Sequence, residues 1–334
     1  MANPIVVEVT RGALVESTHR GAGAVVDAQG RVAFAFGDVG SAVFPRSAVK
    51  AFQALPLVES GAADKLGLTD AEIALACASH GGEAEHVAGV ETMLAKAGLD
   101  ARALACGVHW PLNGKAARAL ARAGDSPTAL HNNCSGKHAG FLCLCRASGW
   151  SVEGYVAADH PAQLAARAAI AELAGAPLGA DVCAVDGCSI PTYALSLEKL
   201  ALAFARFGAG EGLAPARAAA TRRIRAAVAA HPVMIAGEGR FDTEAMTLFG
   251  ERLFVKAGAE GVHCAALPGL GLGLAVKADD GAARAAQATI AALIARFLPM
   301  SEAERDHFAE YVAPRIANCN GLEVGGIRPT AALG

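Results

Sequence analysis

A serine and a lysine stand three residues apart after a proline that favours the start of a helix, in the order Pro45, Ser47, Lys50. Residues with this spacing are neighbours on a helix, with Cβ atoms about 5–6 Å apart, so the Lys50 amine could take the proton of the Ser47 hydroxyl. Unpaired N–H groups near a helix N-terminus also favour the oxyanion of an acyl-transfer reaction. The spacing suits a nucleophile with its base, although by itself it is more typical of an ordinary helix start with an exposed lysine.

Two later segments follow the order found in serine acyl-enzymes of the β-lactamase type. These carry Ser-x-x-Lys, then a second polar element with a serine, then Lys-Thr-Gly on a strand beside the site. This chain has Ser79 in a glycine-bearing turn and Lys256-Ala257-Gly258 at the end of an expected strand. Alanine replaces the threonine, and Ser79-His80-Gly81 replaces the usual Ser-Asp-Asn. The pattern favours an acyl-transfer site without deciding it.

Strands are expected at both ends of the chain and helices between them. Apolar runs at 23–26 and 31–36 flank a turn, and β-compatible runs recur at 252–256, 261–266 and 271–276. Periodicity and caps predict helices at 47–60 (with Pro56 ending it early), 84–96, 116–123, 139–147, 161–174, 212–230 and 280–297. At 69–77 a capping box favours a helix and an apolar alternation favours a strand, and both remain open.

This order of elements predicts an α+β fold, with an antiparallel sheet made of N- and C-terminal strands and helices packed around it. We expect a single domain over residues 1–334 that includes a helical region at about 60–250. A hydrophobic content of 53% supplies ample core material.

Charge and composition exclude several classes of partner. The net charge is −3, with no basic stripe that would predict nucleic-acid binding. No stretch reaches the roughly 18 apolar residues of a membrane helix, and no export signal is recognisable, so we expect a soluble cytoplasmic protein. Nine cysteines without a Cys-x-x-Cys motif fit reduced thiols, most of them in the core.

Six segments resemble, in the same order and with similar spacing, the asparaginases of the rhizobial type, that is, the L-asparaginase II family. They are 46–50, 77–80, 133–138, 186–188, 237–240 and 256–261. The resemblance runs from about residue 10 to residue 285. It implies hydrolysis of L-asparagine to L-aspartate and ammonia, on a fold similar to serine β-lactamases and glutaminases, usually in a homodimer. Gly81 and Gly82 depart from the pattern, because serines are common there in the family.

The resemblance implies that Ser47 is the nucleophile with Lys50 beside it, and that Ser79 and Lys256 form a second Ser-Lys pair facing the same substrate. Two lysines near each other lower each other's pKa, which would make a neutral amine available as a base near pH 7. Which serine reacts first is left open.

The resemblance also implies a zinc ion held by Cys134, Lys137 and Cys188, with His138 and Asp186 close by. A pair of thiolates is a credible zinc site, whereas lysine is an uncommon ligand. From spacing alone the two cysteines are typical of buried core residues. Because a Ser-Lys hydrolase does not need zinc for its nucleophile, our hypothesis is that the metal positions the substrate.

An amino-acid substrate needs opposite charges at fixed spacing to hold its carboxylate and ammonium groups. The candidates for substrate contact are Arg46, His80, His138, Asp186 and Glu238. For two of them the pattern favours a structural role over substrate contact: His80 as a hydrogen-bonded turn residue, and Glu238 as the partner of Arg240 in an ion pair.

The sequence therefore predicts an amidohydrolase that acts on L-asparagine through an acyl-enzyme. One alternative is another Ser-Lys acyl hydrolase, either a glutaminase or a penicillin-recognising enzyme. Another is a zinc-binding homologue that has lost catalysis.

Overall fold

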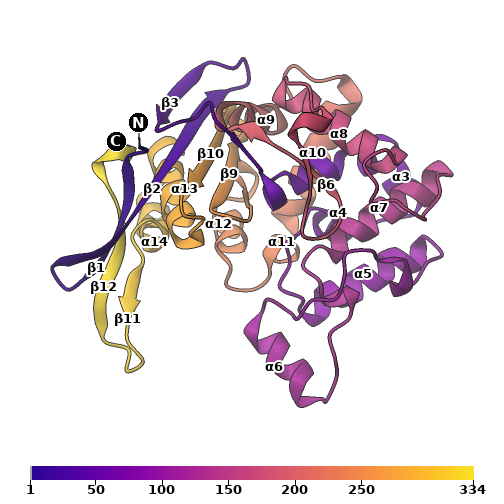
Figure 1. Ribbon diagram of the computed structural model, residues 1–334, viewed down its shortest axis with the longest axis horizontal. Coiled ribbons are helices and arrows are strands. Elements are labelled where there is room, and N and C mark those ends of the chain that lie inside the picture. The colour runs from indigo at the N-terminus through magenta and orange to yellow at the C-terminus, as the bar shows by residue number, and fades with distance from the viewer. Residues whose placement is uncertain (1) are drawn as a thin grey trace. The chain divides into compact units, whose positions relative to one another are not determined.

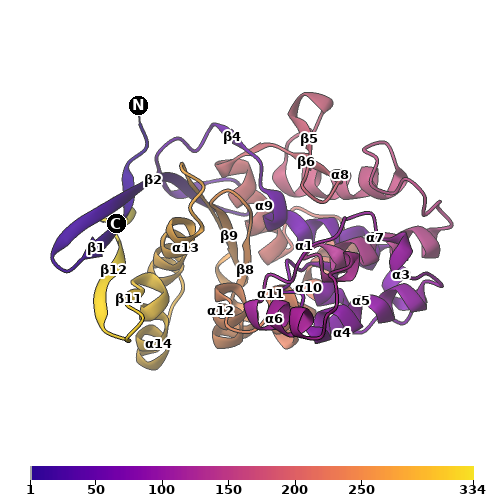
Figure 2. The same ribbon diagram turned by 60° about the horizontal axis from the view of Figure 1, so that its bottom comes forward.

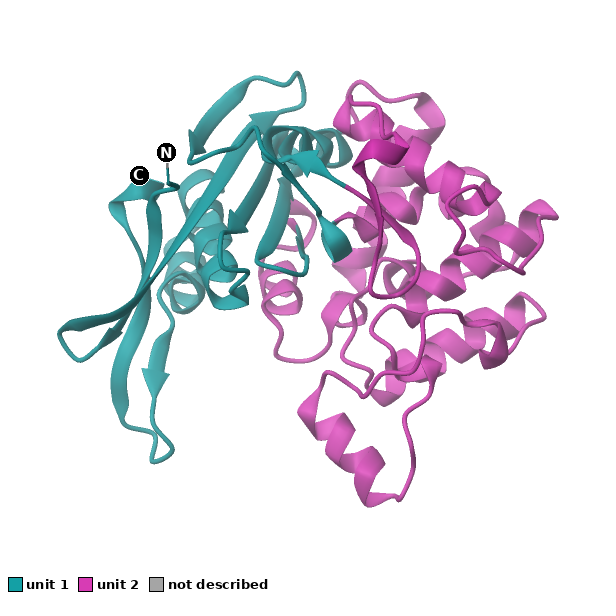
Figure 3. Cartoon of the chain, viewed as in Figure 1, with its two compact units in different colours: residues 1–48, 194–209, 255–334 teal, residues 49–193, 210–254 magenta. Residues whose placement is uncertain are grey.

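The computed structural model describes residues 2–334, which divide into two compact units. Of the described residues, 2–48, 194–209 and 255–334 form the first unit, and 49–193 and 210–254 form the second (Figure 3). The chain thus passes from the first unit to the second between Ser47 and Lys50. Whether the two units behave as one domain stays a prediction.

The first unit is built on an eight-stranded sheet. Seven of its strands follow the order β11-β12-β1-β2-β10-β9-β8, and the eighth, β3, pairs with β2 (Figure 1). Its strands are β1 (Ile5–Arg11), β2 (Leu14–Asp27), β3 (Val32–Phe36), β8 (Phe254–Ala257), β9 (Val262–Leu267), β10 (Leu272–Ala278), β11 (Arg315–Ala317) and β12 (Glu323–Pro329). Strand β2 pairs antiparallel with β10, so that Gly23 lies opposite Val276. Strand β1 pairs antiparallel with β12, so that Val7 lies opposite Pro329. N-terminal and C-terminal strands therefore share one sheet, as expected.

Helices α9 (Leu197–Ala209) and α13 (Ala283–Phe297) pack on this sheet, and α14 (Glu302–Val312) packs on α13 (Figures 1 and 2). A small ladder of β4 (Ala42–Val43) with β7 (Leu195–Ser196) completes the first unit. The predicted α+β class, with an antiparallel sheet and packed helices, is confirmed.

The second unit is almost entirely helical. Its helices are α1 (Lys50–Gln53), α2 (Leu55–Glu59), α3 (Ala62–Lys65), α4 (Asp70–Ala76), α5 (Ala84–Lys96), α6 (Gly114–Arg122), α7 (Ser135–Ser148), α8 (Pro161–Ala174), α10 (Pro215–Ala230), α11 (Val233–Ala236) and α12 (Phe241–Phe249). A hairpin of β5 (Cys183–Val185) and β6 (Pro191–Tyr193) is its only sheet among the described residues.

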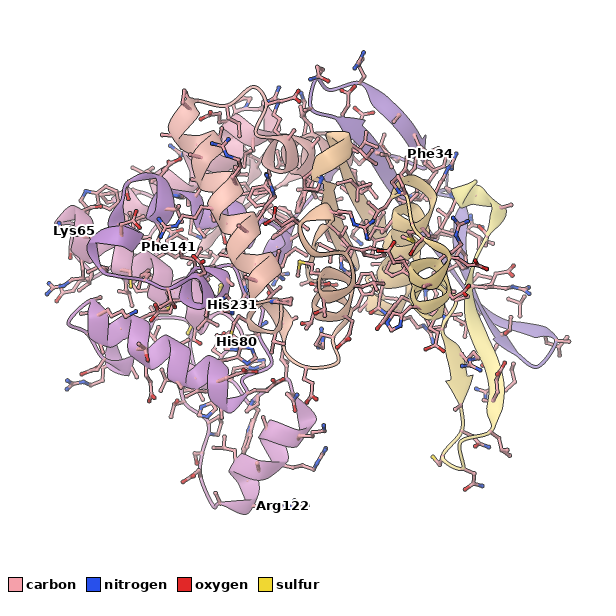
Figure 4. All side chains as sticks on the ribbon, turned by 180° about the vertical axis from the view of Figure 1, so that it is seen from behind. Phe34, Lys65, His80, Arg122, Phe141 and His231 are labelled. Atoms are coloured by element: carbon pink, nitrogen blue, oxygen red, sulfur yellow. The ribbon has the colours of Figure 1, made fainter. Side chains whose placement is uncertain are left out.

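Helix α7 is the core of the second unit, because it packs against α2, α3, α4, α5 and α8. Phe141, which α7 carries, is buried among these helices (Figure 4). At Gly136 the helix approaches α4 so closely that a Cβ atom would come within 2.3 Å of the Leu75 carbonyl oxygen. The packing therefore fixes the first turn of α7, which bears Lys137 and His138.

Three details differ from the sequence predictions or resolve them. Residues 70–76 form a helix, because Thr69 and Glu72 complete the capping box. The segment 47–60 forms a 3-10 turn and two short α-helices, and Pro56 lies in the first turn of α2, where proline is tolerated. Helix α7 begins at Ser135, four residues before the expected start.

Among residues 2–334, no helix is both long enough and apolar enough to cross a membrane.

Candidate active site

Ser47 lies in a strained turn of the first unit. Arg46, which precedes it, has a φ of 52°, in the left-handed region that residues other than glycine rarely adopt. The N–H of Ala48 donates to the carbonyl oxygen of Pro45 at 3.1 Å, which holds the turn. Ser47 is half-buried. Because strained backbone clusters at active sites, the turn is a candidate place for chemistry.

Lys256 lies near the end of β8 in the same unit and is fully buried. Its Nζ donates to the carbonyl oxygen of Ala257 at 2.9 Å. Two residues further on, Gly258 is so close to the turn that a Cβ atom would lie 2.5 Å from the Pro45 carbonyl oxygen. The backbones at Pro45 and Gly258 are therefore in close contact, with Ser47 two residues after Pro45 and Lys256 two residues before Gly258.

Lys50 begins α1 in the second unit and is only 1% exposed. Its Nζ donates to the carbonyl oxygens of Ala78 at 2.6 Å and of Asn133 at 3.3 Å. Burial lowers the pKa of Lys50, and the cysteine sulfurs nearby offset this only in part. The amine is also hydrogen-bonded to the Cys134 sulfur, so three acceptors surround it. A lowered pKa makes the neutral form of the amine, which can accept a proton, easier to reach.

Ser79 follows Ala78 in the turn between α4 and α5 and is half-buried. Its N–H donates to the carbonyl oxygen of Ile235 at 2.8 Å. The Lys50 amine is thus bonded to the residue that directly precedes Ser79, which brings these two predicted residues into one neighbourhood.

A buried cluster of sulfur and nitrogen donors lies beside Lys50. Cys134 occupies the N-cap position of α7, Lys137 lies in the first turn of that helix, and Cys188 comes from the β5–β6 hairpin. The Lys137 Nζ donates to the Cys188 Sγ at 2.9 Å. Cys134 and Cys188 are hydrogen-bonded to each other, and an Oδ2 of Asp186 lies 4.0 Å from the Cys188 Sγ. The structure therefore brings together the three predicted metal ligands.

The charges of this cluster compensate one another. The hydrogen bond from Cys188 holds the pKa of the Cys134 thiol well below its usual value, and the positive charges of Lys137 and Lys50 act in the same direction against burial. That hydrogen bond and burial raise the pKa of Cys188, so the pair retains one proton. Burial alone would lower the pKa of Lys137, but the two sulfurs raise it.

This donor set fits a zinc ion. Two converging sulfurs, one of them a thiolate, are ligands that zinc prefers, and the Lys137 amine supplies a third donor once it gives up a proton. Among residues 2–334, another group of three side chains that could hold a metal ion consists of Glu83, Glu85 and His86. It fits a metal less well, because His86 already uses both ring nitrogens, towards the backbone of Glu83 and of Val233.

His138 and Asp186 lie on the two elements that carry the sulfurs. The Nδ1 of His138 is 2.6 Å from the Tyr155 hydroxyl, and its Nε2 is buried without a partner among the described residues. Burial and the charges of Lys137 and Lys50 lower the pKa of His138, so the ring is neutral. Asp186 accepts the N–H of Gly187 at 2.7 Å.

The other two substrate-contact candidates are placed differently. His80 is fully buried and uses both ring nitrogens within the protein. Glu238 is exposed and lies 3.6 Å from the amine of Lys115, with which it pairs instead of Arg240. Their contact with substrate stays a prediction.

A model of the L-asparaginase II family matches residues 7–329. The chain belongs to this family. L-asparaginase II membership confirms the predicted family and places the chain among amidohydrolases. The matched range includes all the predicted site residues, from Arg46 to Lys256.

No curated protein matches the sequence of this L-asparaginase II family member. Solved structures similar to it include Mglu, at 18% identity over 80% of this chain and 64% of that chain, with a TM-score of 0.36. A second structure of Mglu, in its tris and glutamate form, gives 18% identity over 85% of this chain and 61% of that one, with a TM-score of 0.36. A β-lactamase from Mycobacterium bovis is 16% identical over 87% of this chain and 95% of that chain, with a TM-score of 0.39. The chain thus spans less than two thirds of the length of Mglu, and at these scores the likenesses carry no functional argument.

Sequence reasoning missed four groups that the site uses. The carbonyls of Ala78 and Asn133 hold Lys50, Tyr155 orients His138, and Ser135 binds His80. Backbone carbonyls carry no signal in a sequence. Ser135 directly follows Cys134 of the motif, and this position is the feature of the sequence that could have indicated it.

Proposed function

We propose that this L-asparaginase II family member hydrolyses L-asparagine to L-aspartate and ammonia, with Ser47 as the nucleophile and Lys50 as its base. The observation that carries the proposal is the buried Lys50 amine, which donates to two carbonyls and lies three residues after a serine in a strained turn. Family membership supports the class of reaction.

The proposed reaction runs through an acyl-enzyme. The Ser47 Oγ attacks the side-chain carboxamide carbon while Lys50 takes the hydroxyl proton, which forms a C–O bond and an oxyanion. The oxyanion collapses, the C–N bond breaks, and Lys50 gives its proton to the departing ammonia. Water then attacks the ester with Lys50 again as base, and the proton returns to the Ser47 oxygen as aspartate leaves.

Ser79 and Lys256 stay assigned as the second Ser-Lys pair of the family resemblance. Arg46, His138 and Asp186 stay the candidates for holding the charged groups of the amino acid. Zinc on Cys134, Lys137 and Cys188 would supply a positive charge that helps to orient the substrate. The homodimer and the cytoplasmic location stay predictions.

Ammonia release with L-asparagine, L-glutamine and a cephalosporin tests the proposal. We expect release with asparagine, and Ser47→Ala lowers kcat/KM by about 10³-fold or more while the circular dichroism and thermal midpoint stay unchanged. Replacement of the exposed Ser126 by alanine is the matched control and should leave the rate unchanged. A Ser47→Ala protein that keeps a tenth of the activity would refute the assignment. One methylene is worth only about 1–3 kcal/mol, so glutamine is expected to be a poor substrate.

Metal content tests the zinc site separately. We expect Cys188→Ser to lose zinc in elemental analysis of the purified protein, whereas replacement of the exposed Cys319 by serine should retain it. Zinc binding without any ammonia release would favour the non-catalytic homologue.

A further inference from the structure

The imidazole of His80 lies inside the helical unit (Figure 4) and is fully buried next to Ser79. The backbone N–H of Gly82 donates to the His80 Nδ1 at 3.1 Å. A backbone N–H can only donate, so Nδ1 is the acceptor and the ring hydrogen is on Nε2. This single tautomer is fixed by geometry.

The Nε2–H of His80 continues into the N-terminal turn of α7. It donates to the Oγ of Ser135 at 2.9 Å, and the Ser135 hydroxyl donates to the carbonyl oxygen of Leu130 at 2.8 Å. Ser135 is fully buried and directly follows Cys134. One unbroken line of hydrogen bonds therefore joins the Ser79 turn to the segment that carries the metal ligands. The His86 ring, stacked 4.9 Å away, covers one side of His80.

Lys50 joins the same two segments. Its amine bonds to Ala78, which precedes Ser79, and to Asn133, which precedes Cys134. The distance between those two carbonyls decides whether one amine can reach both. His80 and Ser135 lie within two residues of the two carbonyls, so their hydrogen bond restrains that distance.

We propose that His80 is a positioning residue, which with Ser135 fixes the Ser79 turn against the first turn of α7, and so keeps the carbonyls of Ala78 and Asn133 in place for Lys50. It acts through Ser79 and Lys50 and has no ring nitrogen left for the substrate. Only the kinetic test of this inference depends on the proposed function.

The turn also accounts for the glycine at position 82. Gly82 has a φ of 73°, and a Cβ atom there would lie 2.9 Å from the carbonyl oxygen of His131. A serine at this position would strain the turn, and its N–H would no longer be aimed at His80.

Ser135→Ala tests the proposal, because it removes the acceptor of the His80 Nε2–H without altering the ring. We expect kcat for asparagine to fall about tenfold with KM within a factor of two, because the displaced groups act in the reaction step. Hydrogen exchange at the Ser79 amide, which donates to Ile235, should become at least tenfold faster. The ¹⁵N shifts of wild-type His80 should report a protonated Nε2 and an unprotonated Nδ1.

Thr221→Val is the matched control, because the Thr221 hydroxyl is equally buried but bonds only within its own helix, to Ala218. It should leave both kcat and the Ser79 exchange rate unchanged. His80→Gln, whose amide can still donate to Ser135, should retain more activity than His80→Phe. A Ser135→Ala protein with wild-type kcat and wild-type exchange overturns the positioning role. If the wild type releases no ammonia, the proposed function fails, and the Ser79 exchange rate and the His80 tautomer still decide the inference.

Discussion

Replacement of Gly258 by alanine tests whether the contact between β8 and the Pro45 turn aligns the reacting groups. The added Cβ would lie 2.5 Å from the Pro45 carbonyl oxygen, and real Cβ atoms essentially never come closer than 3.0 Å, so the two backbones must separate by at least about half an ångström. Overpacking of this kind costs about 1–3 kcal/mol of stability. A displacement of about 1 Å at a reacting centre can cost about 10²-fold in rate. We therefore expect kcat/KM for asparagine to fall by about 10- to 100-fold.

The assay is ammonia release at several asparagine concentrations, combined with thermal unfolding. Gly269→Ala is the matched control in the same unit, because a Cβ there meets nothing within 4 Å and its φ is not positive. Its stability should be unchanged or slightly higher, since alanine restricts the unfolded chain more than glycine does. If Gly258→Ala has wild-type kinetics and the stability of Gly269→Ala, then the contact does not place Ser47 and Lys256.

Two further predictions concern stability. Burial first, and nearby positive charges second, hold the pKa of His80 and of His138 well below the usual value in the folded state. Below about pH 6.5 the unfolded chain therefore binds more protons than the folded chain, and the free energy of unfolding falls with decreasing pH by up to about 1.4 kcal/mol per pH unit for each histidine. Urea unfolding at pH 7 and pH 5 measures this change. An equal free energy of unfolding at the two pH values would contradict the prediction. Arg217 is largely buried and donates two hydrogen bonds to Glu59, at 2.8 and 2.7 Å. Arg217→Met should therefore lower the free energy of unfolding by about 2 kcal/mol in the same urea assay. Replacement of the exposed Arg102 is the control and should leave the unfolding midpoint unchanged. Equal midpoints for the two arginine variants would show that the buried pair contributes nothing.

Local signals predicted those elements that depend on neighbouring residues. The turn at 27–30, the capping box at Thr69 and Glu72, and the helix at 161–174 all follow from short patterns, and the structure contains each of them. Strands β11 and β12 were not predicted, because β12 includes two glycines and ends in a proline, residues that weaken a strand signal. Only the pairing of β12 with β1 makes it a strand.

The candidate site divides in the same way. Ser47 and Lys50 are visible in the sequence because they are three residues apart. The contact between Cys134 and Cys188 joins α7 to a hairpin some fifty residues further along the chain. No periodicity in the sequence indicates such a contact, and only the family resemblance predicted it. Helix α7 begins at Ser135, whose side chain bonds to His80 instead of capping the helix. A polar run before an apolar helix does not distinguish these two roles.

The order of strands in the large sheet has a consequence for biosynthesis. Strands β1 and β2 are made long before their partners β12 and β10 leave the ribosome. Until then the nascent N-terminal hairpin presents open strand edges, which invite intermolecular pairing. We therefore expect the yield of soluble protein to depend on expression temperature and on chaperones more than the thermal stability of the finished molecule would indicate.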